Sequence, residues 1–247
     1  MISAIISKEL KSMFASPLAW VLMAFLQGIF SFIFMSQLEN FSMMQAQLAS
    51  MSDGPGLTEV VVTPVFSIAA IVMLFSVPLL TMRLIAEERR NQTIIFLISA
   101  PLSMTQIILG KFLATVLFLE IIFFITFLMC LSVLPGGALD FGLLFSCVLG
   151  ISLLGATFSA IGLFVSCLTN HPVVAAILSL AVALGLWIIN LTNPDPESVL
   201  NLISIFSHWE PFLEGTIALK NIAYFMLIIA VFIILSIRRL DADRLQS

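Results

Sequence analysis

RLIAEERRNQTIIFLISAPLSMTQIILGK, residues 83–111, is the one long stretch of this chain in which a dense charge cluster interrupts apolar sequence. Glu87 to Arg90 form the cluster, apolar residues return at helical spacing from Ile94, and Ala100-Pro101-Leu102-Ser103 ends the pattern. A charged, broken amphipathic helix cannot lie in hydrocarbon, where every polar group needs a partner. The stretch therefore predicts a helix over residues 85–104 at a membrane surface, between two membrane spans.

The composition around this stretch is that of a membrane protein. Of the 247 residues, 61% are hydrophobic and only 10% are charged, whereas a soluble domain carries about 25% charged residues. The three cysteines, Cys130, Cys147 and Cys167, lie far apart in apolar runs and have no metal-binding spacing. We expect them to be small buried residues.

Six apolar runs approach or exceed the roughly 20 residues that a membrane-crossing helix needs. The predicted spans are 17–38, 63–84, 107–133, 141–168, 173–192 and 221–237. The fold class is therefore an all-α polytopic membrane protein with a single transmembrane domain over residues 1–247. Residues 193–220, between the last two spans, contain short apolar pieces that predict re-entrant or interfacial helices.

The N-terminal residues 1–14 predict a short amphipathic helix, the elbow helix, ahead of the first span. Ile2, Ile5 and Leu10 share its apolar face, while Lys8 and Lys11 lie opposite. Glu9 falls close to the apolar face, which a water-exposed helix would not need. The run after this helix is long enough to span and no small-residue cleavage site follows, so we expect it to be retained.

The basic residues predict the orientation. With both termini in the cytoplasm, nine of the ten lysines and arginines lie on the cytoplasmic side, and only Lys220 lies outside. The reverse orientation would translocate the whole 83–111 cluster. We therefore expect a multi-pass membrane protein with both termini inside.

The fourth span carries small residues at intervals of four, which let helices approach closely in lipid. The repeats are Gly142, Ser146 and Gly150, and Ser152, Ala156 and Ala160. They predict a packing face, either within one subunit, which we favour about two to one, or between subunits.

Three motifs carry a resemblance to a known family. EERR-xx-TIIFLISAPLS followed by IILGKFLA resembles the signature of ABC-type-2 permeases, the membrane subunits of one exporter class. The N-terminal SKELKSMFASPLAW and the late FSHWEPFLEGTI are similar to the gliding-motility-associated subgroup of these permeases. That subgroup usually has a Gly between the charges and the Thr, where this chain has Asn91-Gln92.

The resemblance implies a partner and a site. It implies a separate ABC ATPase in two copies, which binds ATP and Mg²⁺, and a second copy of this permease or a related one. It also makes 85–104 the coupling helix that docks on the ATPase. Its expected contact residues are the charged Glu87, Glu88, Arg89 and Arg90, then Thr93 as a cap, the apolar anchors Ile94 and Leu97, and Pro101 as the helix end. Membrane lipid is an expected partner and nucleic acid is not.

The chain itself has no motif for binding ATP or for catalysis. Gly110-Lys111 is followed by Phe112 and lacks the earlier Gly of a phosphate-binding loop. His171 and His208 are predicted on opposite membrane sides, so they cannot share a site. We expect no enzyme activity and no cofactor in this chain.

Glu120 is the one ionisable residue deep in a predicted span, about 13 Å beyond Lys111 at ~1.5 Å per residue. A carboxylate there faces a cavity or a partner, because its desolvation is costly. It predicts either a pathway or interface acid, or a carboxyl bonded to a Ser or Thr of a neighbouring span. The alternative function is accordingly an ATPase-independent carrier or channel that uses Glu120.

Overall fold

The computed structural model describes residues 2–48, 56–93, 103–134, 139–192 and 202–246. Every regular element in these ranges is a helix, which confirms the all-α prediction. Six of the described helical segments are long and apolar enough to cross a membrane. The elements are α1 Ile2–Ala15, α2 Pro17–Leu48, the π-helix η1 Thr58–Val62, α3 Thr63–Thr81, α4 Ala86–Arg90, α6 Met104–Leu131, α7 Phe141–Leu168, α8 Pro172–Thr192, α9 Ile205–Leu213 and α10 Leu219–Gln246.

The membrane helices match the predicted apolar runs in number, but two of them run further. Helix α2 continues to Leu48, past the predicted end at residue 38, and α10 continues to Gln246, past residue 237. The apolar pattern stops where a helix leaves the membrane, whereas backbone hydrogen bonding continues into water. The helices therefore extend beyond the part that hydrophobicity marks.

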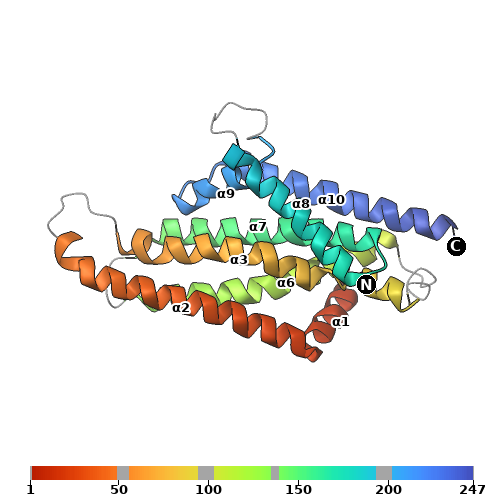
Figure 1. Cartoon of the computed structure of the whole chain (residues 1–247), viewed down its shortest axis with the longest axis horizontal. Coiled ribbons are helices and arrows are strands. Elements are labelled where there is room, and N and C mark those ends of the chain that lie inside the picture. The colour runs from red at the N-terminus through yellow and green to blue at the C-terminus, as the bar shows by residue number, and fades with distance from the viewer. Residues whose placement is uncertain (1, 49–55, 94–102, 135–138, 193–201, 247) are drawn as a thin grey trace.

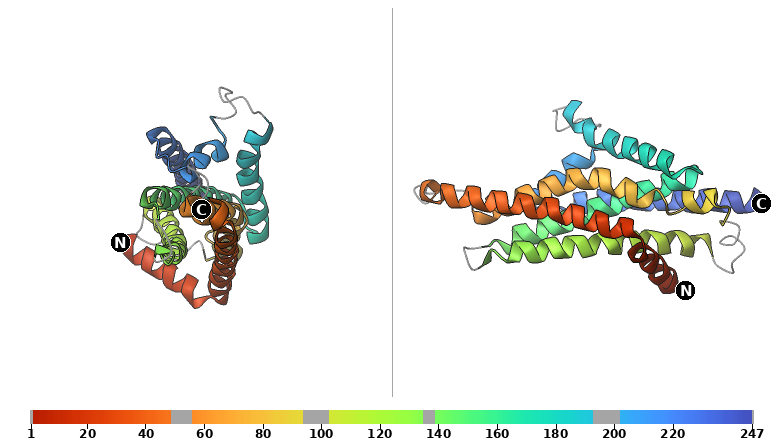
Figure 2. Two further views of the ribbon diagram at one scale, coloured as in Figure 1. Left: turned by 90° about the vertical axis from the view of Figure 1, so that its left-hand side faces the viewer. Right: turned by 60° about the horizontal axis from the view of Figure 1, so that its bottom comes forward.

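Helix α7 is the centre of the bundle, and α3, α6, α8, α9 and α10 all pack on it (Figures 1 and 2). Its small residues provide the close approaches. Phe212 of α9 lies over Gly150, Phe123 of α6 lies over Gly155, and Thr81 of α3 lies over Gly162. The small-residue repeat is thus a packing face within one subunit.

Two helix starts are fixed by their own side chains. Ser103 and Gln106 form a reciprocal capping box at the start of α6. Asp140 accepts hydrogen bonds from the backbone N–H groups of Gly142 and Leu143 at the start of α7.

Helix α9 occupies part of the predicted loop 193–220 and packs against the N-terminal half of α7. The Oγ of Ser146 donates to the carbonyl of Phe212 at 2.9 Å, and Trp209 and Phe212 are buried. This agrees with a short apolar helix between the last two spans.

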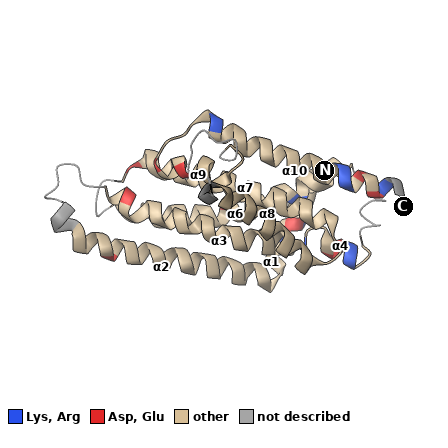
Figure 3. Cartoon of the chain, turned by 45° about the horizontal axis from the view of Figure 1, so that its top comes forward, with Lys and Arg blue, Asp and Glu red and all other residues tan. Residues whose placement is uncertain are grey.

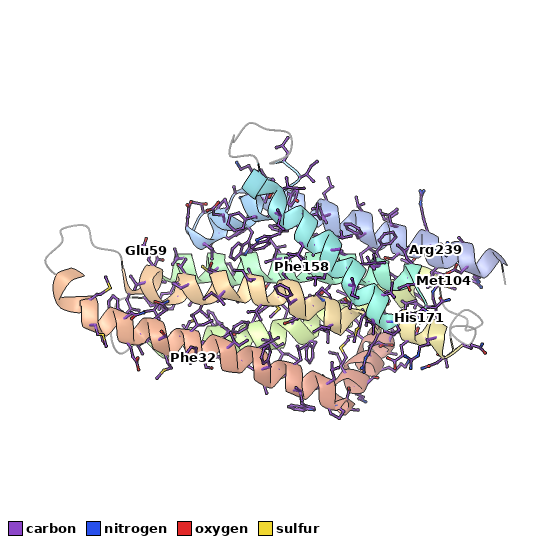
Figure 4. All side chains as sticks on the ribbon, viewed as in Figure 1. Phe32, Glu59, Met104, Phe158, His171 and Arg239 are labelled. Atoms are coloured by element: carbon purple, nitrogen blue, oxygen red, sulfur yellow. The ribbon has the colours of Figure 1, made fainter. Side chains whose placement is uncertain are left out.

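Both termini lie at the same end of the bundle (Figure 1). Figure 4 places Met104, His171 and Arg239 toward this end, Glu59 at the other end and Phe158 between them. Figure 3 shows Lys and Arg gathered mainly where α4 and the end of α10 meet, while most of the helical middle is uncharged. We refer to the end that holds α4 and both termini as the α4 end.

Candidate functional site

The site is centred on α4, a single short helix whose start is capped by a residue far away in sequence. Its own N-cap, Ile85, provides no side-chain cap. Ser166 of α7 provides one instead, because its Oγ accepts from the backbone N–H groups of Ile85 and Ala86 at 3.1 and 3.0 Å. The same hydroxyl donates to the carbonyl of Met82. Helix α4 is therefore attached to the end of the central membrane helix.

The end of α4 is equally well defined. Gln92 has a left-handed backbone with φ of 56°, and its N–H bonds to the carbonyl of Arg89. The N–H and the hydroxyl of Thr93 both bond to the carbonyl of Glu88. These two backbone bonds form a Schellman motif, which ends a helix. Of the broken helix predicted over 85–104, the structure describes α4 and the turn at residues 91–93 that ends it.

Thr93 closes α4 through its bonds to the carbonyl of Glu88. Its predicted place at the start or cap of the next turn involves residues outside the described ranges and stays a prediction. Ile94, Leu97 and Pro101 lie outside the described residues, so their expected contact with an ATPase stays a prediction.

Lys111 of α6 joins three helices at the α4 end. Its side chain is 2% exposed, and its Nζ lies 2.8 Å from Oε1 of Glu88 in α4 and 3.1 Å from Oε1 of Glu9 in α1. A buried ammonium needs such partners, because an unpaired one is very costly to desolvate. The three residues form what we call the Lys111 triad, and it fixes both α1 and α4 to the start of α6.

Arg89 makes a second connection, from α4 to the last membrane helix. Its guanidinium forms a close ion pair with Asp243 near the end of α10. Arg239 lies one turn before Asp243 and is 3.6 Å from it. Leu240 of the same turn is fully buried among Leu84 and Ile85. The end of α10 is therefore part of the site.

The four charges of the cluster thus divide into two pairs. Glu88 and Arg89 point into the chain and have partners there, whereas Glu87 is half-buried and Arg90 is exposed. The outward surface of α4 consists of Arg90, Asn91, Gln92 and Thr93. Of the four predicted charges, Glu87 and Arg90 remain available to a partner protein.

A cavity of about 390 Å³ opens beside α4. It lies between α1, the start of α2, the end of α3, α4 and the start of α6. Its walls include Lys8, Arg83 and Glu87 together with the Lys111 triad. Among the described side chains, no group of three or more His, Cys, Asp or Glu is arranged to hold a metal ion.

Glu120 lies away from α4, within α6. The Oγ of Ser152 in α7 donates to its Oε2 at 3.0 Å, and both side chains are half-buried. Of the two predicted arrangements, the hydrogen bond to a serine of a neighbouring span is the one observed. A role for Glu120 in the pathway or at a subunit interface stays a prediction.

Sequence reasoning missed four residues of the site. The sequence could have revealed Glu9, because an acid beside an apolar helix face needs a buried partner. It could also have revealed Lys111, because this is a single Lys at the start of an apolar run. Ser166 and Asp243 have no local pattern, because only the folded chain brings them to α4.

The fold and the site define a polytopic membrane protein with a buried, charge-paired junction at one end. A family model described as "ABC-2 family transporter protein" matches residues 3–245, and the chain belongs to that family. It is a permease, the transmembrane component of an ABC transporter, and permeases of this family generally work with an ABC ATPase. The curated proteins contain no sequence that matches this chain.

Proposed function

We propose that this chain is the membrane subunit of an ATP-driven exporter in a bacterial inner membrane. Separate ATPase subunits bind ATP and Mg²⁺, and the complete transporter has two permeases and two ATPases. Support comes from the family match over residues 3–245, from the six membrane helices and from the partner that the family generally has. The late FSHWEPFLEGTI motif favours the gliding-motility-associated subgroup.

The α4 end faces the cytoplasm in this proposal. The support is that nine of the ten basic residues fall on that side of the membrane, since basic residues are retained inside. Ser42→Cys and Asn91→Cys provide the test, because both positions are exposed and lie at opposite ends. The native cysteines are buried and free, so background labelling is low. A membrane-impermeant thiol reagent on intact cells should label position 42 and not position 91.

The ATPase pushes on the outward surface of α4 and on the segment that follows. The single observation that carries this assignment is that α4 is bonded to three membrane helices: to α7 through Ser166, to α6 through Lys111 and to α10 through Asp243. A force on such a helix reaches the membrane region without first bending a loop. Glu87 and Arg90 set the orientation of the contact, as rim charges do.

Charge reversal at Glu87 and Arg90 tests the coupling of the ATPase to α4. The double change Glu87→Arg with Arg90→Glu spares Glu88 and Arg89, so the internal ion pairs survive. We expect normal membrane insertion and an unchanged melting temperature. Co-purification with the ATPase should fall by at least about tenfold, as the loss of one good charge-assisted contact predicts.

Lys11→Glu is the matched control, because Lys11 is an exposed charge on α1 that does not lie on α4. It should leave ATPase binding unchanged. Full ATPase binding and stimulated ATP hydrolysis in the double variant would refute the coupling role. Transport by purified permease in liposomes without any ATPase would contradict the exporter assignment itself.

A further inference from the structure

The cavity beside α4 has walls of two chemical kinds. Met13, Leu18, Ala19 and Leu80 form its apolar wall, and the last three belong to the membrane helices α2 and α3. Its other wall carries charged and polar groups from α1 and α4. An occupant that satisfies both walls must be amphipathic and must lie at the boundary between membrane and water.

The path of helix α1 along α6 accounts for the cavity beside α4. It follows the first turns of α6, with Ile5 against Gly110 near its start and the ring of Phe14 5.6 Å from that of Phe118 near its end. Those two positions on α6 are about 12 Å apart at ~1.5 Å per residue. Helix α1 therefore slopes along α6, and the cavity lies between it and α4.

The charges of the cavity that remain available have both signs. Lys111 is already neutralised by Glu9 and Glu88. Arg83 is exposed and has no ion-pair partner among the described side chains. Lys8 is 66% exposed and makes only a 3.5 Å contact with Glu9. Two cations are thus free to bind an anionic group such as a phosphate.

An acceptor for a cation lies opposite them. Glu87 lines the same cavity and is half-buried. The Oε2 atom of Glu88, another lining residue, is buried and has no hydrogen-bond partner within the described part of the chain. A primary ammonium, with three N–H donors, suits such carboxylates, whereas a choline group has no donor to give.

We propose that this cavity binds one phospholipid with a zwitterionic ethanolamine headgroup. The phosphate lies at Lys8 and Arg83, the ammonium lies at Glu87, and an acyl chain follows Leu18 and Leu80 into the membrane. The volume of 390 Å³ is within the range of about 300–1,000 Å³ typical of small-molecule sites. The bound lipid completes the junction of α1 with α4.

The test uses the full-length permease without any ATPase, so its result does not depend on the proposed coupling. The protein is reconstituted into nanodiscs with equal amounts of phosphatidylethanolamine, phosphatidylcholine and phosphatidylglycerol, released in mild detergent and measured by native mass spectrometry. We expect one retained phosphatidylethanolamine per chain, preferred over each other lipid by about tenfold, the ratio that one charge-assisted hydrogen bond produces.

Matched variants locate the site. Lys8→Gln with Arg83→Gln should abolish retention of the lipid, because it removes both cations at the phosphate, while Lys11→Gln, which does not line the cavity, should leave retention unchanged. Glycerophosphoethanolamine, which has no acyl chains, should fail to displace the lipid. Equal retention of the three lipids, retention unaffected by the double change, or displacement by the soluble headgroup would each overturn the proposal.

A protein occupant gives a different pattern. If the double variant retains lipid like the native chain but loses ATPase co-purification, the cavity is a protein contact and the lipid proposal is wrong. Loss of lipid retention with normal ATPase binding supports the lipid site and leaves the coupling surface on α4 untouched.

Discussion

Lys111 and Glu88 form a largely buried ion pair, with Nζ and Oε1 2.8 Å apart, although they belong to different helices and lie 23 positions apart in the sequence. Glu9 adds a third member at 3.1 Å. Two acids face one ammonium, so removal of Lys111 leaves both acids without a counterion, and removal of either acid takes away one of the two partners of Lys111. The junction of α1, α4 and α6 therefore depends on all three residues.

Lys111→Met should destabilise the protein. Methionine fills a similar volume but leaves Glu9 and Glu88 facing each other without a cation. Removal of one partner from a buried pair costs about 3–5 kcal/mol, and we expect roughly 2–3 because these acids are 12% and 20% exposed and keep some water. The measurement is the melting temperature in detergent, with Lys8→Met as the exposed control.

A second substitution makes this test specific. Glu9→Gln should lower the stability of the native chain but raise that of the Lys111→Met variant, because it then removes a repulsive charge. Equal melting of Lys111→Met and the native chain, or a loss on adding Glu9→Gln to that variant, would show that the triad is not the source of stability.

Ser166→Ala should loosen α4 while leaving the bundle intact. The change removes the only side-chain cap found at the start of α4 in the described structure, and loss of such a cap costs about 1 kcal/mol. Hydrogen exchange of the peptide that covers residues 85–90 should become faster. Ser159→Ala is the control, because Ser159 is a buried serine of the same helix that bonds only to its own helix, at Gly155.

Gln92→Gly should tighten the end of α4. Gln92 has φ of 56°, a conformation that costs a residue with a side chain roughly 1 kcal/mol and costs glycine little. Exchange of the amides at residues 91–93 should slow. Asn91→Gly, where φ is −85°, should bring no such gain. If both glycines act alike, backbone strain at Gln92 is not the cause.

The six membrane helices could be predicted because long uncharged runs have few other stable states. The ends of α2 and α10 could not, since hydropathy marks where lipid ends and gives no sign of where a helix ends. The end of α4 at residue 92 could not be predicted either. Asn91-Gln92 lacks the glycine that usually marks a helix end, so the sequence gives no sign of the turn there.

The contacts of the candidate site were harder to predict than its position. The charge cluster identified α4, but nothing in its sequence distinguishes Glu88 and Arg89, which pair internally, from Glu87 and Arg90. That division depends on Lys111 and Asp243, which reach α4 only through the packing of α6 and α10. Ser166 is one of several serines in a small-residue helix, and its role follows from where α7 ends.

Acidification should destabilise the end of the bundle that holds α9, through His208. Burial lowers the pKa of His208 below its usual value of about 6.5, the hydrogen bond to the Ser204 carbonyl opposes this, and Lys220 adds to it. The unfolded chain then binds a proton more readily than the folded one. Stability is complete above pH 6.5 and falls as the pH drops through the lowered pKa.

The measurement is the melting temperature between pH 7.5 and 5.5. His208→Gln should flatten the part of the slope that His208 causes, because it removes the titrating ring that stacks on Tyr224 at 3.9 Å. His171→Gln, in the exposed loop between α7 and α8, is the matched control. An identical slope in the native chain and His208→Gln would exclude this histidine as the cause.

Glu120→Leu and Glu120→Gln should separate a structural role of Glu120 from a role in transport. Glutamine keeps an oxygen that can accept from Ser152, so its variant should fold and melt like the native chain. Leucine cannot accept, and the loss should be about 0.6–1 kcal/mol, as for other hydrogen bonds between membrane helices. Ser152→Ala should cost a similar amount, and the Leu and Ala changes together should cost no more than either alone, because they break the same bond.

Additive losses in that double variant would mean that Glu120 and Ser152 do not interact. Transport with the ATPase present answers the remaining question. If Glu120→Gln preserves stability but lowers transport, the ionisable carboxyl itself takes part in the pathway or at a subunit interface. If Glu120→Leu is expressed and transports like the native chain, Glu120 has no such part, and its bond to Ser152 only makes an acid tolerable at this depth of the membrane.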